Sequence, residues 1–255
     1  MSILSYNLHS NANTYNSLRI GLLLAGFVLF GSLFCTASLF SQSINEDVAQ
    51  QFLHAIHWYG HGSFRIELEG ETVYIDPWNL PNAPKADYIL ITNPHFGHFS
   101  KEDINTLKTA KTVIVAVKAV AAKIDEGSIK IIEPGQKLRF GSLVIEAVPA
   151  YTVTNNYFPR EKDYAGYLIS NAHIRIYCAG STDVVPEMEQ IRCDIALLPV
   201  SGAPVMGPEE AAQATRIIKP SIAIPMHYGA IIGSIRDAHR FKDLAETRVE
   251  ILGIE

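Results

Sequence analysis

Alternating apolar and polar residues mark the start of the folded part of this chain. Positions 64–68 alternate with a period of two, and Glu69-Gly70 then leads into a second apolar segment at 72–76. This is the pattern of an antiparallel hairpin. Two further strands are predicted at 87–92 and 112–117, where apolar and β-branched residues run together.

Helices and strands alternate along the rest of the sequence. Ser100 is suited to cap a helix that runs to about Lys108, and Pro208 begins a second predicted helix that ends near Lys219. A third helix is expected around 236–247. The remaining predicted strands are 143–148, 164–170, 173–178, 194–200, 221–226 and 249–252. Two halves of hairpins followed by βα units predict an α/β (α+β) protein, in which two packed sheets are covered by helices.

The N-terminal region has a different character. Residues 20–40 carry no charge, and Arg19 lies just before them, which is typical of a signal peptide or a single membrane anchor. Small residues in Cys35-Thr36-Ala37 favour cleavage after Ala37, although the run is long enough to span a bilayer uncleaved. We therefore expect an exported (periplasmic or extracellular) or membrane-anchored protein, with residues 1–43 as leader or anchor and 54–255 as the domain.

Composition limits the classes of function. Of the 255 residues, 48% are apolar and 18% are charged, as in folded globular proteins. The net charge is −5, and no Lys/Arg cluster is interleaved with aromatic residues, so nucleic acid is not an expected partner. The three cysteines lack the count and spacing of a disulfide framework or a zinc knuckle.

Several polar residues share one property, which is that each follows an apolar strand. They are Asp76, His95, His98, Ser181, Asp183 and His227. Residues at strand ends on one edge of packed sheets can converge on a single cleft. A lone histidine beside a strand is usually a buried structural residue, but four such strand ends together favour a shared site.

From about His57 the chain resembles the metallo-β-lactamase superfamily, and within it the metal-dependent hydrolases similar to ascorbate-6-phosphate lactonase. The motifs that carry the resemblance are Trp58-Tyr59-Gly60-His61-Gly62-Ser63-Phe64, Tyr74-Ile75-Asp76-Pro77, residues 92–98, Val148-Pro149-Ala150-Tyr151, Ala179-Gly180-Ser181-Thr182-Asp183, Ala196-Leu197-Leu198-Pro199 and Pro225-Met226-His227-Tyr228-Gly229. The resemblance implies a four-layer αββα sandwich of the metallo-β-lactamase type. It also implies two zinc or manganese ions at one edge of the sheets, with a bridging hydroxide as nucleophile.

The ligands implied by the resemblance are only partly present. Where the family has His-x-His-x-Asp-His, this chain keeps His95 and His98 but has Asn93 and Gly97. Ser181 stands where the family has a bridging aspartate, whereas the closing histidine is intact as His227. A further family histidine has no counterpart, since Thr152 and Phe158 occupy the corresponding places.

These replacements limit the expected metal content. Asn and Ser are poor zinc ligands beside imidazole or carboxylate, and Gly offers no ligand. The loss of both carboxylates predicts at most one zinc or manganese ion, or none. Three neutral imidazoles, those of His95, His98 and His227, could hold one ion with water in the fourth position.

Two other side chains are candidates for catalysis. His61 could orient a substrate or transfer a proton. Asp183, like Asp76, could substitute for a missing carboxylate, although a role in capping a helix or turning a loop is an alternative for both.

The sequence leaves several functions open. The first is an exported hydrolase homologue with a degenerate metal site, impaired or non-catalytic, that binds a small molecule in the old cleft. The alternative is an active hydrolase that uses one ion on the three histidines. A third is a membrane-tethered scaffold without a ligand. Whether the protein is an enzyme is therefore open, and neither substrate nor oligomeric state is indicated.

Overall fold

The first sheet grows from the hairpin predicted at Glu69-Gly70. In the computed structural model, which describes residues 47–255, both of these residues have a positive φ and join two antiparallel strands. The sheet contains, in spatial order, β1 (Ile56–Trp58), β2 (Phe64–Leu68), β3 (Glu71–Ile75), β4 (Tyr88–Ile91), β5 (Val113–Ala116) and β6 (Ser128–Ile131). Strands β3 to β6 pair in parallel, so their carboxyl ends lie along one edge.

The second sheet repeats this plan. Its members are β7 (Lys137–Phe140), β8 (Leu143–Pro149), β9 (Ala165–Ser170), β10 (Arg175–Cys178), β11 (Ile195–Pro199), β12 (Ile222–Met226) and β13 (Arg248–Val249). Strands β7 to β10 are antiparallel, and β10 to β13 are parallel. Strands β11 and β12 are buried along their whole length, as expected for parallel strands covered on both faces.

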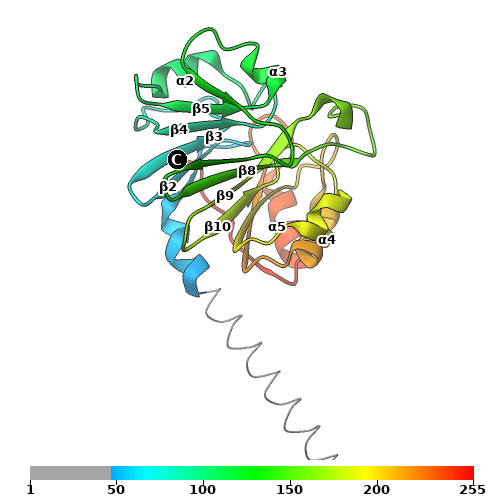
Figure 1. The fold of residues 1–255 in the computed structure, drawn as a ribbon. Helices are drawn as coiled ribbons and strands as arrows, with labels where there is room; N and C mark the ends of the chain where they lie inside the picture. Colours follow the sequence, from blue (N-terminus) through cyan, green and yellow to red (C-terminus); the bar gives the residue numbers. More distant parts are fainter. Residues whose placement is uncertain (1–46) are drawn as a thin grey trace, which may run out of the picture. The chain divides into compact units, whose positions relative to one another are not determined.

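Helices cover the outer faces of the two sheets. On one side are α2 (Lys101–Leu107) and α3 (Lys118–Ala121), and on the other α4 (Pro208–Ile218) and α5 (Ile235–Leu244) (Figure 1). Short 3₁₀ helices are η1 (Leu53–Ala55), η2 (Arg160–Lys162) and η3 (Pro186–Gln190). Helix α2 begins as predicted, because the Ser100 hydroxyl accepts a hydrogen bond from the backbone N–H of Asp103 at 3.2 Å.

Direct contacts join the two sheets near the edge where β4 ends. The hydroxyl of Tyr167, on β9, donates to the carbonyl of Ile91 over 2.8 Å. The backbone N–H of Ala165 donates to the carbonyl of Thr92 over 3.2 Å. The predicted sandwich of two sheets covered by helices is therefore confirmed.

Strands β1, β6 and β7 and helix α3 were not predicted from the sequence. Strand β6 lies at an edge of its sheet with three of its four residues exposed, and β7 alternates exposed and half-buried residues. Neither strand has the apolar pattern that marks a core strand. The strand predicted at 249–252 is shorter and pairs only through Arg248 and Val249.

The run at 20–40, predicted to direct export or anchoring, lies outside the described residues. Within residues 47–255, every helix is too short or too polar to cross a bilayer.

Candidate metal centre

Three histidine side chains meet at the edge of the sandwich. His98 comes from the loop after β4, His227 follows β12, and His61 lies in the loop between β1 and β2. One nitrogen of each ring lies within 4.8 Å of the nitrogens of the other two, and all three residues are buried. The ring of His61 has its centroid 3.8 Å from that of His227 and 5.0 Å from that of His98. The three rings are close enough to share one ion after small side-chain rotations.

Backbone conformation helps to hold this group together. His61, His227 and Asp76 all have left-handed φ values, of 50°, 64° and 44°, which residues other than glycine rarely adopt. The backbone N–H of His227 donates to the carbonyl of His61 over 2.8 Å, and the indole N–H of Trp58 donates to the same carbonyl. Such conformations persist where the surrounding structure enforces them, and they cluster at functional sites.

Asp76 fixes the orientation of His98. Its Oδ2 lies 2.7 Å from Nδ1 of His98, and the backbone N–H and hydroxyl of Thr92 donate to the same carboxylate. Since an ionised carboxylate only accepts, His98 donates from Nδ1 and, in its neutral form, has its lone pair on Nε2. A carboxylate that orients an imidazole in this way is the usual support of a metal-binding histidine.

Ser201 contacts Nδ1 of His227, as Asp76 contacts Nδ1 of His98. Its hydroxyl oxygen lies 3.0 Å from Nδ1 of His227 and 3.3 Å from the carbonyl of Gly202, to which it can donate. The serine oxygen is then free to accept from Nδ1, which leaves Nε2 of His227 available. Nδ1 of His61, by contrast, is buried without a hydrogen-bond partner among the described residues.

Burial keeps two of these rings uncharged. Desolvation, with a smaller contribution from His98, lowers the pKa of His61 from its ordinary 6.5 to about 3. Desolvation also holds the pKa of His227 well below that value, with further contributions from His61 and His98. Neutral imidazole is the form that binds metal ions, so these rings need no deprotonation at neutral pH.

His95 does not belong to this group of three histidines. Its ring packs 4.8 Å from the ring of Phe158 and 5.6 Å from that of Tyr164, between centroids. The predicted ligand set was His95, His98 and His227, whereas the structure brings His61 to His98 and His227. At the two positions where the resemblance led us to expect a further histidine, the Thr152 hydroxyl is bonded within its own loop and the Phe158 ring packs on His95.

Asn93 and Ser181, which were expected from the sequence to stand at ligand positions, form hydrogen bonds with their neighbours. The side-chain amide of Asn93 donates to the hydroxyls of Ser181 and Thr92 over 3.2 and 3.0 Å. The Asn93 carbonyl oxygen accepts from the backbone N–H of His95. Ser181 Oγ lies 3.1 Å from Nε2 of His98. Asp76, His98 and Ser181 thus form a continuous buried chain of hydrogen bonds.

This chain has the connectivity of a Ser-His-Asp triad, but its serine is poorly placed to be a nucleophile. Only 1% of Ser181 is exposed, and this residue does not line the cavity described below. An attacking hydroxyl must reach a reacting atom of the substrate, so a nucleophilic role for Ser181 is not supported, and the Asp76 end of the chain is explained as support for His98.

Gly97 leaves room for His61. A Cβ at this position would lie 2.4 Å from Cδ1 of Ile231 and 2.8 Å from Cδ2 of His61, and the residue has φ +91°. The space that an aspartate side chain would need is therefore filled by these two residues. Gly62 has a similar role, since a Cβ there would lie 2.9 Å from Cε1 of His98. Of the two glycines that flank His61 in the sequence, only Gly62 lies against His98, and a glycine in a loop does not by itself indicate such a contact.

Asp183, a predicted catalytic candidate, binds a loop instead. Its Oδ2 accepts hydrogen bonds from the backbone N–H groups of Val153 and Thr154 and from the Thr154 hydroxyl, at 2.8, 2.9 and 2.8 Å. These contacts correspond to the loop-turning alternative for this residue.

A cavity of about 560 Å³ opens over the three imidazoles. His61, His98 and His227 contribute to its lining together with His95 and Asn155. The other lining residues are apolar or aromatic, namely Phe96, Tyr157, Phe158, Ala203, Pro204, Ile231 and Ile232. Its size and its few polar groups are typical of a small-molecule site.

The chain belongs to the metallo-beta-lactamase superfamily, since residues 55–227 match the family described as beta-lactamase superfamily domain. Among its relatives is the UPF0173 metal-dependent hydrolase of Staphylothermus marinus, 34% identical over 222 residues, with 77% of this chain and 95% of the relative covered. The UPF0173 metal-dependent hydrolase of Methanopyrus kandleri is 30% identical, with 78% and 93% covered. The predicted superfamily is confirmed.

Solved structures share this fold. A protein from Parabacteroides distasonis, proposed to be a metal-dependent hydrolase, superposes with a TM-score of 0.71 at 31% identity, covering 78% of this chain and 93% of that one. Igni18, a metallo hydrolase of Ignicoccus hospitalis, gives a TM-score of 0.65 at 23% identity, with 77% and 94% covered. The second likeness concerns the fold alone.

Proposed function

We propose that this protein is a hydrolase that holds one divalent metal ion on His61, His98 and His227. The observation that carries the proposal is the convergence of three ring nitrogens within 4.8 Å. The proposal keeps the single-ion alternative of the sequence analysis but replaces His95 with His61. Three histidines and an open fourth position are a ligand set found in catalytic zinc sites.

The donor set supports one ion rather than two. Asn93 and Ser181 are committed to hydrogen bonds with each other and with their neighbours, and Gly97 contributes no ligand. The carboxylate of Asp76 is engaged with His98 and Thr92. A second cation beside the first would lack the bridging carboxylate that offsets its charge. The metal is zinc or manganese by family resemblance.

A divalent cation held there supplies Lewis acidity and an activated water nucleophile. The protein positions and protects this chemistry. Asp76 keeps the proton of His98 on Nδ1, and Ser201 orients His227. The apolar walls of the cavity exclude bulk water, which strengthens electrostatic interactions inside it.

Metal analysis tests the proposal. Zinc added to the metal-depleted domain is expected to bind at about one equivalent per chain, and His61→Ala, His98→Ala and His227→Ala should each abolish tight binding. His95→Ala is the matched control and should retain the ion. Ester hydrolysis should disappear with a chelator and return with zinc. Two tight ions per chain, or none, would contradict the proposal.

Ligand binding without catalysis is the second candidate. The hydrogen bond between Ser181 and Nε2 of His98 favours it, since that bond occupies the nitrogen that would bind metal. A domain that binds no metal yet retains a small molecule would fit this candidate.

We also propose that residues 20–40 direct export or anchor the domain. The charge-free run and the small residues near Ala37 support this proposal. Fractionation of cells expressing the full chain tests it. Recovery of uncleaved chain in the soluble cytoplasm would contradict it.

A further inference from the structure

The walls of the cavity above the three imidazoles are apolar and unusually exposed. Phe96, Tyr157 and Ile231 line the cavity and are 74%, 65% and 42% exposed. They are three of the seven large apolar residues that are strongly exposed among the described residues. Phe96 is supported from below by Trp78, whose ring centroid lies 5.4 Å away. Exposed apolar surface that gathers around a pocket indicates a ligand with apolar parts.

Charge is missing from the same walls. The residues that line the cavity include no Lys, Arg, Asp or Glu. Recognition of a carboxylate or phosphate usually relies on Arg or Lys, and no such side chain contributes to this lining. The polar groups of the lining are the imidazoles, the amide of Asn155 and the hydroxyl of Tyr157.

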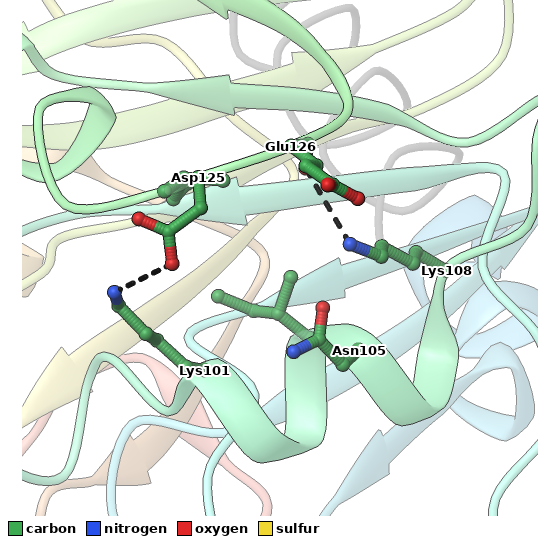
Figure 2. A pocket seen from close by; sticks show the side chains of 7 residues that line it. Lys101, Asn105, Lys108, Asp125 and Glu126 are labelled. Carbon is green, nitrogen blue, oxygen red and sulfur yellow. Dashed lines mark hydrogen bonds and ion pairs between the residues drawn. The ribbon is translucent and has the colours of Figure 1, made fainter.

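A second hollow on the molecule differs from this cavity in the charge of its lining. It lies between α2 and the segment after α3, and it is lined by charged side chains (Figure 2). Its cations already have partners, because Lys101 pairs with Asp125 at 2.9 Å and Lys108 donates to the carbonyl of Glu126. Charged side chains thus gather at this hollow, whereas the lining of the cavity above the imidazoles contains no Lys, Arg, Asp or Glu.

We infer that the cavity of the metal centre accepts a neutral carboxylic ester or lactone whose acyl part is apolar. The acyl part would lie against Phe96, Tyr157 and Ile231, with its carbonyl group toward the three imidazoles. Water adds to the carbonyl carbon and the bond to the leaving oxygen breaks. One proton of the water ends on the leaving alcohol, and the other is released when the carboxylic acid that forms ionises. This inference rests on the proposed hydrolase function for turnover but not for binding.

A series of p-nitrophenyl esters tests the inference on the zinc-loaded domain. From acetate through butyrate to hexanoate, kcat/KM is expected to rise by roughly threefold for each added methylene that is buried. The p-nitrophenyl monoester of adipate has a similar length but ends in a carboxylate. It should be hydrolysed at least roughly tenfold more slowly than the hexanoate, since its carboxylate would lie against apolar walls that contain no Lys or Arg to pair with it.

Binding is measured separately from turnover. The neutral fluorophore N-phenyl-1-naphthylamine is expected to bind the metal-free domain, and 2-octanone should displace it, whereas adipate should not. Phe96→Ser and Tyr157→Ser should each weaken this binding and flatten the chain-length series. Ile131→Ser is the control, because Ile131 is 54% exposed on β6 and lies outside the cavity lining.

The outcomes separate the inference from the proposed function. Binding of 2-octanone without ester hydrolysis would support the apolar ligand class and contradict hydrolysis. Hydrolysis without preference for longer neutral esters, or with preference for the adipate monoester, would overturn the inference and leave the hydrolase proposal intact. Failure of both binding and hydrolysis would overturn both. A loss of binding in Ile131→Ser as large as in Phe96→Ser would also overturn the inference.

Discussion

Nδ1 of His98 lies 2.7 Å from Oδ2 of Asp76, and both side chains are buried. Asp76 is well placed to orient this ring because it follows β3, the strand that pairs in parallel with β4, after which His98 lies. We predict that Asp76→Asn lowers zinc affinity about 10- to 100-fold, because the amide can no longer fix the Nδ1–H tautomer. Competition with a fluorescent zinc chelator measures the change.

Asp183→Asn is the matched control for this prediction. Asp183 is equally buried, but it binds the loop at Val153 and Thr154. The control should lose about 1–3 kcal/mol of stability with little change in zinc affinity. Equal losses of affinity in both variants would contradict the assigned role of Asp76.

Substitution of the two serines near the metal centre should change zinc affinity in opposite directions. Ser181 lies on Nε2 of His98, where it competes with a metal ion, whereas Ser201 lies on Nδ1 of His227 and orients that ring. We predict that Ser181→Ala raises zinc affinity about fivefold, since a hydrogen bond worth about 1 kcal/mol no longer has to be broken. Ser201→Ala should lower it. Isothermal titration at constant pH gives both values, and changes of the same sign would argue against this arrangement.

Gly97 should be intolerant of a side chain because His61 and Ile231 fill the space beside it. We predict that Gly97→Ala costs more stability than the roughly 1 kcal/mol expected from backbone conformation alone, and that it also weakens zinc binding by displacing His61. Gly135→Ala is the control, since Gly135 has φ +89° but a Cβ added there would have no other atom within 4 Å. Urea unfolding of both variants measures the difference, and equal losses would show that crowding at Gly97 has no effect.

The stability of the metal-free domain should depend on pH through its buried histidines. The pKa of His61 is lowered to about 3 and that of His227 is also strongly lowered, whereas both should titrate near 6.5 in the unfolded chain. Below pH 6.5 the unfolded state therefore binds more protons, and stability falls as the pH falls toward 3. The slope is about 1.4 kcal/mol per pH unit for each residue.

Urea unfolding in the presence of a chelator, at pH 7.5, 6 and 5, checks this prediction. His61→Gln, which does not titrate in this range, should reduce the slope. Stability that stays constant from pH 7.5 to 5 would contradict the buried neutral state of these rings. Above pH 7 the two histidines should contribute no pH dependence.

Local patterns in the sequence were sufficient for most of the fold. The hairpin at 69–70, the cap at Ser100 and the helix that begins at Pro208 follow from short-range rules of turns and helix ends. The apolar runs that became β4, β11 and β12 are long enough to be recognised without knowledge of their partners. The edge strands β6 and β7 could not be recognised in this way. A strand with little buried surface is determined mainly by the neighbour with which it pairs.

The sequence also determined which residues gather at the edge of the sheets, because a residue after a parallel strand must lie near that edge. Only the tertiary structure decided which side chains face one another there. His95 and His98 are three residues apart, yet aromatic packing by Phe158 and Tyr164 holds one ring in the cavity wall, while Asp76 turns the other toward His61 and His227. The direction of a side chain in a loop depends on contacts from segments distant in the sequence, and for this reason the place of His61 in the metal centre could not be read from the chain alone.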